Sequence, residues 1–395
     1  MSDWQLTDFV VEEDPEKDRF HDFALPLPLM QAIADAGFEY CTPIQSAVLP
    51  YSLADYDVTG QAQTGTGKTA AFLIALLTRL WENPKQNQKI GQPRSLILAP
   101  TRELAMQIED DANQLVGHMD QYVHCVVGGI DFQKQLDKLR GSLVDVLVAT
   151  PGRLIDFVNR REIDLRAVEV LVIDEADRML DMGFIPDVRR IVYQTPHKRN
   201  RQTLFFSATF NDDVMRLAKS WTLAPEHVVI QPETVATETV DQKFWVVGSQ
   251  QKAALMAEVI KKQAPKRALI FANRRDATHR LQAYLSKAGI PCEPLAGDVP
   301  QRKRLATLNR FKEGALPYLV ATDVAGRGIH VDGVTHVFNF DLPEDPEDYV
   351  HRIGRTGRAG AEGTSISFIS EDDAFNLPPL EEYLGTRIEC VQPEL

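Results

Sequence analysis

The sequence predicts an α/β protein of two domains, each built on a parallel sheet with helices on both faces. Short apolar segments such as SLILAP (95–100) and VEVLVI (168–173) alternate with amphipathic segments of helical length. Continuously apolar strands are typical of parallel sheets that are buried on both faces. The pattern is interrupted at QPETVATETVDQ (231–242), which contains no Lys or Arg and few apolar residues, and then it resumes. The chain is therefore expected to contain two domains of similar design.

The predicted elements follow one another in a regular order. In the first domain, residues 20–230, we expect strands at 57–62, 95–100, 123–127, 144–150, 168–173 and 202–209, with a helix at 69–81. In the second domain, residues 243–385, we expect strands at 267–272, 317–323, 335–340 and 364–370. Residues 231–242 are expected to form a flexible linker, and residues 386–395 a short C-terminal end.

Composition excludes several classes of protein. The 395 residues are 44% hydrophobic and 25% charged, which is ordinary for a soluble globular protein. Four widely separated cysteines without a C-x-x-C pair argue against a disulfide framework and against a zinc site, and they suit a reducing compartment. No signal peptide is recognisable, and the longest apolar run, residues 70–77, is too short to span a bilayer. We expect a cytoplasmic protein that makes no membrane contact.

Charge is distributed unevenly along the chain. The formal net charge is −13, and residues 1–19 carry seven acids, which predicts a solvated, mobile arm. Between Lys266 and Lys312, eleven Lys and Arg residues stand against three acids. This basic stretch is either a salt-bridged surface or a surface that faces phosphates, since a local field matters more than net charge.

The segment AQTGTGKT (62–69) is similar to a phosphate-binding loop, whose usual pattern is G-x-x-x-x-G-K-[ST]. Ala62 replaces the first glycine, so the segment alone also permits a Gly/Thr-rich turn. A strand before it and a helix after it favour a nucleotide site, because N–H groups at a helix N-terminus bind phosphate oxygens. Lys68 would contact the β- and γ-phosphates, and the Thr69 hydroxyl would ligate Mg²⁺. The nucleotide-binding residues expected here are Thr64, Gly65, Thr66, Gly67, Lys68 and Thr69.

Two carboxylates follow the predicted strand at 168–173. The carboxyl ends of parallel strands form the ligand-binding edge of such a sheet, so Asp174 and Glu175 are expected at that edge. Asp174 would hold Mg²⁺, largely through water, and Glu175 would orient or deprotonate the attacking water. A solvated acidic turn is the alternative for this segment taken alone.

The segment HRIGRTGR (351–358) places Arg352, Arg355 and Arg358 around two glycines in the second domain. Arginines that converge on a γ-phosphoryl group stabilise the transition state of its transfer and raise the rate by a factor of about 10³–10⁵. A plain surface or an RNA-binding patch are the alternatives. If these arginines act in hydrolysis, the active site is shared between the domains, and they must close on each other.

The ordered set of short segments resembles the DEAD-box ATP-dependent RNA helicases over about residues 20–385. The segments that carry the resemblance are Phe20 with GFEYCTPIQ (37–45), AQTGTGKT (62–69), PTRELA (100–105), Gly128–Gly129, TPGR (150–153), DEAD (174–177), SAT (207–209), LIFAN (269–273), QRKR (301–304), ATDVAGRGIH (321–330) and HRIGRTGR (351–358). In this family the phosphate loop has the pattern A-x-T-G-x-G-K-T, which Ala62 fits. The resemblance implies two tandem RecA-like domains and ATP hydrolysis at their interface, with Mg²⁺ as cofactor.

The resemblance also implies roles for individual residues. Phe20 would stack on adenine and Gln45 would read its edge, which favours ATP over GTP. The catalytic set would be Lys68, Asp174, Glu175, Arg355 and Arg358. Asp177, Ser207, Thr209 and His351 would link the γ-phosphate to the RNA surface, although capping of a strand end also explains Ser207 and Thr209.

RNA contacts are implied for residues in both domains: Thr101, Arg102, Gly129, Thr150, Arg153, Arg274, Arg304 and Thr322. Contacts to phosphate and ribose carry little sequence information, and 2′-OH contacts would discriminate against DNA. Arg102 and Arg153 could instead be helix-start residues that pair with nearby acids.

Two departures from the family pattern stand in ATDVAGRGIH. Gly326 replaces the usual Ala, and His330 replaces the usual Asp, which leaves that nucleotide-side contact in doubt. The histidine and the segment VTHVFNFDLPEDPEDYVHRIGRTGRAG look like the RhlB branch, which implies bacterial RNA turnover beside ribonuclease E in a degradosome. We expect a monomer that unwinds short RNA duplexes locally. An ATP-gated RNA clamp is the main alternative, and a DNA helicase or a kinase is a more distant one.

Overall fold

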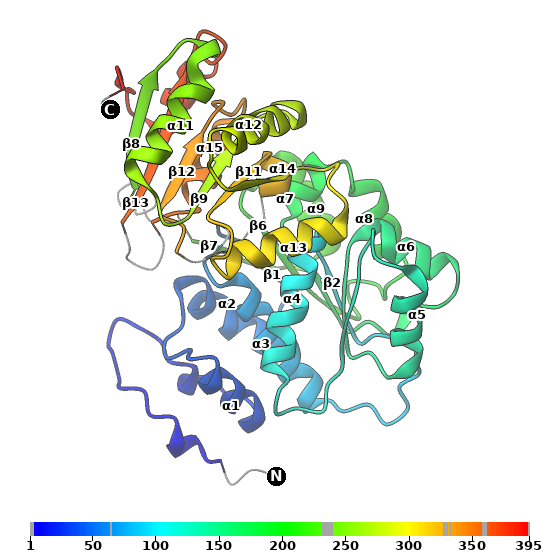
Figure 1. Ribbon diagram of the computed structural model, residues 1–395. Helices are drawn as coiled ribbons and strands as arrows, with labels where there is room; N and C mark the ends of the chain where they lie inside the picture. The colour runs from blue at the N-terminus through cyan, green and yellow to red at the C-terminus, as the bar shows by residue number, and fades with distance from the viewer. Residues whose placement is uncertain are drawn as a thin grey trace. The chain divides into compact units, whose positions relative to one another are not determined.

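The first domain is a seven-stranded parallel sheet between two layers of helices (Figure 1). The computed structural model describes residues 4–63, 65–230, 240–326, 331, 333–357 and 362–393. The strand order is β3-β4-β2-β5-β6-β1-β7, and every neighbouring pair is parallel. The strands are β1 (Val58–Gln61), β2 (Ser95–Leu98), β3 (Val123–Val126), β4 (Val146–Ala149), β5 (Val170–Ile173), β6 (Gln202–Ser207) and β7 (Glu226–Val229).

Helices connect these strands in the order expected of a doubly wound sheet. The α-helices are α1 (Leu27–Asp35), α2 (Pro43–Leu53), α3 (Lys68–Glu82), α4 (Arg102–Leu115), α5 (Phe132–Gly141), α6 (Pro151–Asn159), α7 (Ala176–Asp181), α8 (Ile185–Val192) and α9 (Asp212–Trp221). Three short 3-10 helices are η1 (Leu6–Asp8), η2 (Phe20–Asp22) and η3 (Leu165–Ala167). Helix α3 begins at Lys68, so the phosphate loop leads directly into its first turn.

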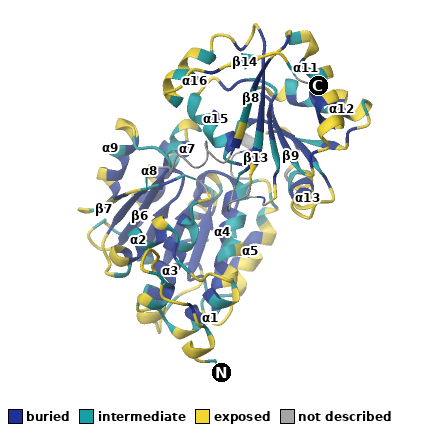
Figure 2. Cartoon of the chain, turned by 90° about the vertical axis from the view of Figure 1, so that its left-hand side faces the viewer, coloured by how far each residue is buried: buried dark blue, intermediate teal, exposed yellow. Residues whose placement is uncertain are grey.

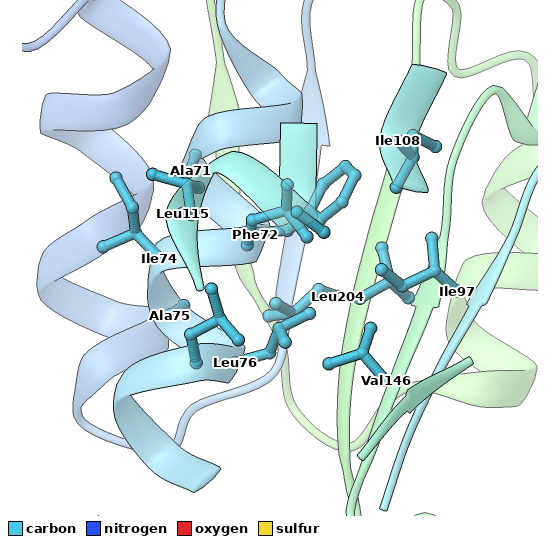
Figure 3. Packing of buried hydrophobic residues seen from close by; sticks show 14 of the residues in the cluster. Ala71, Phe72, Ile74, Ala75, Leu76, Ile97, Ile108, Leu115, Val146 and Leu204 are labelled. Atoms are coloured by element: carbon cyan, nitrogen blue, oxygen red, sulfur yellow. The ribbon is translucent and has the colours of Figure 1, made fainter. Parts of the chain in front are cut away.

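Strand β5 shows why the sheet is covered on both faces. Val170 and Val172 belong to one apolar cluster, whereas Leu171 and Ile173 belong to another. Successive side chains of a strand point to opposite faces, so both faces of β5 need a helical cover. Figure 3 shows Phe72 of α3 in the first of these clusters, and Figure 2 shows the strands buried between helices with exposed outer sides. Full burial of one such side chain contributes about 1.5–3 kcal/mol.

The second domain repeats the connectivity of the first. Its seven-stranded parallel sheet has the order β10-β11-β9-β12-β13-β8-β14, which is the order of the first sheet with each strand replaced by its counterpart. The strands are β8 (Val240–Val246), β9 (Ala268–Phe271), β10 (Cys292–Leu295), β11 (Tyr318–Ala321), β12 (His336–Asn339), β13 (Gly363–Ile369) and β14 (Cys390–Val391). The helices are η4 (Ser249–Gln251), α11 (Lys252–Gln263), α12 (Arg275–Lys287), α13 (Gln301–Lys312), α14 (Asp323–Gly326), α15 (Pro346–Ile353) and α16 (Leu377–Leu384). The predicted fold class, two parallel α/β domains, is confirmed.

The termini of the domains differ from the predicted boundaries. Residues 4–19 are mostly exposed, as their charge suggested, but the segment is anchored to the domain: Val11 is buried, and the Tyr40 hydroxyl donates to the carbonyl of Glu12 at 2.9 Å. Arg19 binds Glu13 of this segment and Asp22 of η2, and Trp4 and Phe9 are partly buried against the core of the domain. Strand β8 begins at Val240, inside the predicted linker, and residues 231–239 lie outside the described part of the chain. Strand β14 likewise adds residues beyond 385 to the second sheet.

Four strands were missed in the sequence: β7, β8, β10 and β14. Three of them, β7, β10 and β14, are sheet edges, where a strand needs less apolar sequence, and β8 contains the polar run DQK.

Within the described residues, none of the helices combines the length and the apolar character that crossing a membrane requires.

A polar network lies at the centre of the second domain. The Arg352 side chain is almost completely buried, and its guanidinium donates to both carboxylate oxygens of Asp323, at 2.5 and 2.6 Å. It also donates to Asn273 Oδ1 at 2.7 Å and to the carbonyl of Asp341 at 2.6 Å. These partners follow β9, β11 and β12, so one side chain ties three neighbouring strand ends together.

Arg352→Ala should therefore destabilise the second domain. Removing one partner of a buried ion pair costs about 3–5 kcal/mol, because the other charge stays buried without compensation. Hydrogen exchange of peptides from β9 and β12 in the full chain should be faster by about a hundredfold or more. Arg310→Ala, which breaks the exposed pair with Glu293, should change exchange little. Equal protection in the two variants would contradict the structural role of Arg352.

Candidate functional site

The phosphate loop connects β1 to α3. Gly65 and Gly67 have φ angles of 88° and 95°, which glycine adopts without steric cost. A Cβ at Gly67 would lie only 2.6 Å from Nε2 of Gln45, so only glycine fits here. The Lys68 ammonium is largely buried and donates to the backbone carbonyls of Ala62 and Gln63, the latter at 2.9 Å. The loop thus places a lysine and the N–H groups of a helix N-terminus together, an arrangement that binds phosphates. Thr64 lies outside the described residues.

Gln45 joins the start of α2 to the phosphate loop. Its Oε1 accepts from the backbone N–H of Thr42 at 2.8 Å, and its Nε2 donates to the carbonyl of Gly67 at 3.2 Å. Phe20 belongs to the core of the first domain, where its ring is stacked against Phe38 with centroids 6.3 Å apart. No part of Phe20 is exposed in the structure, so adenine stacking by this ring stays a prediction that requires the ring to become accessible.

Asp174 follows β5 directly and is almost completely buried. Burial raises the pKa of its carboxyl to about 7, an effect that Glu175 strengthens and the Lys68 ammonium opposes. Its Oδ1 accepts from the backbone N–H of Glu175 at 2.9 Å. A buried carboxylate and the Thr69 hydroxyl are hard oxygen donors of the kind that Mg²⁺ prefers, and Mg²⁺ commonly keeps several waters. Among the described residues no cluster of three or more His, Cys, Asp or Glu side chains could hold a metal. One buried carboxylate and one hydroxyl fit an ion that keeps most of its waters.

Glu175 has a left-handed backbone conformation, with φ 51° and ψ 54°. A non-glycine residue in this region costs about 1–3 kcal/mol and persists only where its surroundings hold it. Here its Oε2 accepts from Arg178 at 2.9 Å, in an ion pair that is buried on both sides. Arg178 was not among the predicted site residues; it lies three residues after Glu175, a spacing that brings side chains together only on a helix, and no helix was predicted there.

The Asp177 carboxylate joins the ends of β5 and β6. Its Oδ2 accepts from the backbone N–H groups of Ala208 and Thr209, at 3.0 and 2.9 Å, and from the Thr209 hydroxyl at 3.3 Å. The Ser207 hydroxyl in turn accepts from the backbone N–H of Asp177 at 3.1 Å. The structure therefore brings Asp177, Ser207 and Thr209 together, and the same bonds cap the end of β6. His351 lies in α15 of the second domain, with its Nδ1 3.9 Å from Oδ1 of Asp348.

Five residues with implied RNA contacts lie at the carboxyl ends of β2, β3 and β4, which are neighbours in the first sheet. Thr101 and Thr150 are the N-cap residues of α4 and α6. The Arg102 guanidinium lies against Gly129, where any Cβ would overlap it. Arg153 donates to the carbonyl of Ile130 at 3.0 Å, and burial lowers the pKa of its guanidinium. This bond goes to a backbone carbonyl, whereas the alternative for Arg153 was an ion pair with a nearby acid.

The second domain carries the remaining predicted residues. Arg274 is exposed at the start of α12 and lines a hollow of about 810 Å³. Arg304 lies on α13, and Thr322 follows β11. Arg355 Nε donates to the carbonyl of His351 at 3.2 Å. Arg352 is not available for a phosphate, because the network described above uses its guanidinium. Arg358 and His330 lie outside the described residues.

Gly326, the other departure from the family pattern, has a local reason. A Cβ at this position would overlap the buried ring of Phe271, so the missing methyl group leaves room for that ring. The buried pair of Lys252 and Asp373, 2.5 Å apart, lines the same hollow as Arg274 and was not recognised in the sequence. The two residues are 121 positions apart, so no local pattern reveals them.

Comparison with known proteins identifies the family. Residues 42–217 match the DEAD/DEAH box helicase family, and residues 251–360 match the helicase conserved C-terminal domain. The ATP-dependent RNA helicase RhlB of Pseudomonas aeruginosa is 57% identical over 385 residues, which cover 97% of both chains.

Two solved structures share the fold over nearly the whole chain. Saccharomyces cerevisiae Dbp5 bound to RNA and ADP BeF3 has a TM-score of 0.83 at 30% identity, with 95% of each chain covered. Mss116p bound to ssRNA and AMP-PNP has a TM-score of 0.85 at 31% identity, and the match covers 98% of this chain and 81% of that one. The chain belongs to the RhlB branch of the DEAD-box ATP-dependent RNA helicases.

Proposed function

We propose that this chain hydrolyses ATP when RNA is bound and uses the cycle to separate short RNA duplexes locally, without sequence preference. One observation carries the proposal: Asp177 hydrogen-bonds the strand end at Ala208 and Thr209, between the loops that would hold phosphate and the loops that would hold RNA. In the sheet order, β5 and β6 lie next to β1 on one side and β2 on the other. A shift of the carboxylates on γ-phosphate binding would therefore move this link, and with it the adjoining RNA surface.

The first domain would supply the proton acceptor and the groups that bind the phosphates and the metal ion. Glu175 would accept a proton from the attacking water, and the Arg178 pair holds its carboxylate in place for that task. Lys68 would neutralise charge on the β- and γ-phosphates. Mg²⁺, held by Asp174 through water and by Thr69, would supply further neutralisation of the phosphate oxygens. Phe20 and Gln45 would recognise adenine, for which Gln45 must exchange its present bond to Gly67.

The second domain would complete the site during catalysis. Arg355 and Arg358 would stabilise the charge that develops on the γ-phosphoryl group, and His351 would act with Asp177, Ser207 and Thr209 in coupling. RNA would contact Thr101, Arg102, Gly129, Thr150 and Arg153 in the first domain and Arg274, Arg304 and Thr322 in the second. We further propose that the chain acts in the bacterial cytoplasm as a monomer, with ribonuclease E as a partner in RNA turnover.

Glu175→Gln should bind ATP and RNA but hydrolyse ATP at least about a hundredfold more slowly, because the amide cannot accept the proton. Single-turnover hydrolysis and nucleotide binding, measured on the same preparation, check this. Asp181→Asn, on the exposed side of the same helix, is the matched control and should keep the wild-type rate. Normal turnover by the Glu175→Gln variant would contradict the assigned role.

Arg355→Ala should reduce RNA-stimulated hydrolysis by about tenfold or more while leaving ATP affinity nearly intact, since the guanidinium would act on the transition state. The exposed Arg387→Ala serves as a control for loss of one positive charge from the second domain. If nucleotide binding falls instead of the rate, Arg355 anchors the ground state.

Single-stranded RNA should stimulate ATP hydrolysis more than DNA of the same sequence, because contacts to the 2′-OH discriminate between them. Rates should be compared with RNA, with DNA and with neither, each with and without a ribonuclease E fragment. Equal stimulation by DNA would argue for a DNA helicase.

The same samples distinguish the clamp alternative. An ATP-gated clamp would show stimulated hydrolysis and slow RNA release without strand separation of a short duplex, whereas the proposed helicase releases the displaced strand.

A further inference from the structure

A hollow of about 670 Å³ lies in the first domain between the last turns of α6 and α8. Its lining combines apolar side chains, the half-buried Val158 and the buried Ile163 and Leu165, with exposed Arg161 and Tyr193. The segment containing η3 leads into β5, and the segment after α8 leads into β6. The hollow thus lies where these strands begin, whereas the phosphate loop, Asp174 and the predicted RNA contacts lie where strands end. It is a separate surface.

The surroundings of the hollow are strongly basic in a chain whose net charge is −13. Arg160 and Arg161 follow α6, Arg166 lies on η3, and Arg189 and Arg190 occupy the last turn of α8, all of them exposed. Two of the neighbouring acids have partners: Glu162 pairs with Arg140, and Asp164 pairs with Arg166 and accepts from Gln92. With Asp156 of α6 and Asp187 of α8 there are four acids against Arg140 and the five arginines named above. Positive charge therefore exceeds negative charge on this face.

Helix dipoles explain part of this pattern, because cations are stabilised at helix C-termini. They do not explain Arg161. It has a φ of 61°, and it follows the C-cap residue of α6 at a position where glycine is usual. An arginine at this position costs backbone strain that a glycine would avoid. We therefore infer that the side chain of Arg161 has a role.

Tyr193 is the second observation that points to a ligand. It caps α8, three residues after Arg190, and 85% of it is exposed beside the hollow. Tyr193 lines the hollow together with Arg161, and Arg190 lies one turn before it on α8. An exposed aromatic ring on a surface that also carries arginines is the combination that binds single-stranded nucleic acid, by base stacking and phosphate neutralisation.

We propose that this hollow is an auxiliary binding site for single-stranded RNA, in which Tyr193 stacks on a base while Arg161 and Arg190 neutralise phosphates. The inference rests on the proposed RNA-dependent function. Helix α6 connects this auxiliary site with Arg153 near its other end: from Arg153 to Asn159, the last helical residue, the helix rises about 9 Å at 1.5 Å per residue. A strand that leaves the predicted RNA contacts could therefore reach Tyr193 along α6, so long RNA would use both surfaces.

The test compares the full chain with Tyr193→Ala and with the double variant Arg161→Ala/Arg190→Ala, using single-stranded RNAs of about 10 and about 30 nucleotides, since one binding module covers about 4–16. Each variant should bind the long RNA about tenfold more weakly and the short RNA nearly as tightly as wild type. The double variant should also flatten the log–log salt dependence of the long-RNA affinity by about 1.4, at about 0.7 per phosphate. Tyr193→Phe, which keeps the stacking face, should restore the affinity.

Matched controls are Tyr56→Ala, at another exposed tyrosine of the same domain, and Arg216→Ala/Lys219→Ala on the exposed side of α9. Both should bind long RNA as wild type does. Thermal midpoints verify that all variants are folded. Wild-type affinity for long RNA in both Tyr193→Ala and the double variant would overturn the inference and leave the patch to an acidic protein, with the proposed function untouched. Failure of the wild-type chain to bind any RNA would instead refute the proposed function.

Discussion

The parallel direction of all strands is the constraint on which the rest of the structure depends. Because every described strand pair is parallel, the loops that follow the strands emerge at one edge of each sheet. The order of the strands then decides which functional loops lie next to each other. In the first domain it places the phosphate loop after β1, the carboxylates after β5 and the RNA-implied residues after β2, β3 and β4, with Asp177 bonded across the boundary.

The two domains use this constraint differently. They share one strand order, but the end of β5 carries Asp174 and Glu175, whereas its counterpart β12 ends in a segment that a buried arginine holds together. In the first domain a lysine and two acids are gathered where a ligand can meet them. In the second, Arg352 is already paired with Asp323, the acid that follows β11. One topology thus yields a reactive edge in one copy and a structural support in the other.

Much of the fold and of the site could be predicted because the signals are local. A continuous apolar strand followed by Asp174 and Glu175, or Gly67 before Lys68, is read within ten residues. The burial of Arg352 could not be predicted, since its partners Asn273 and Asp323 come from other strands and motif position gives no depth. The anchoring of residues 4–19 could not be predicted for a related reason: the charge of the segment gives no sign that Val11 is buried while most of its neighbours stay exposed.

The left-handed backbone conformation of Glu175 lowers the stability of the fold at the residue that is proposed to be needed for ATP turnover. Glycine or asparagine at this position would relax the backbone by about 1–3 kcal/mol, but it would remove the residue that is proposed to activate water. Such a replacement would also take the Glu175 carboxylate away from the buried guanidinium of Arg178, and loss of one partner of a buried ion pair costs about 3–5 kcal/mol. The ion pair therefore outweighs the backbone strain, and a selection for resistance to heat alone would retain Glu175.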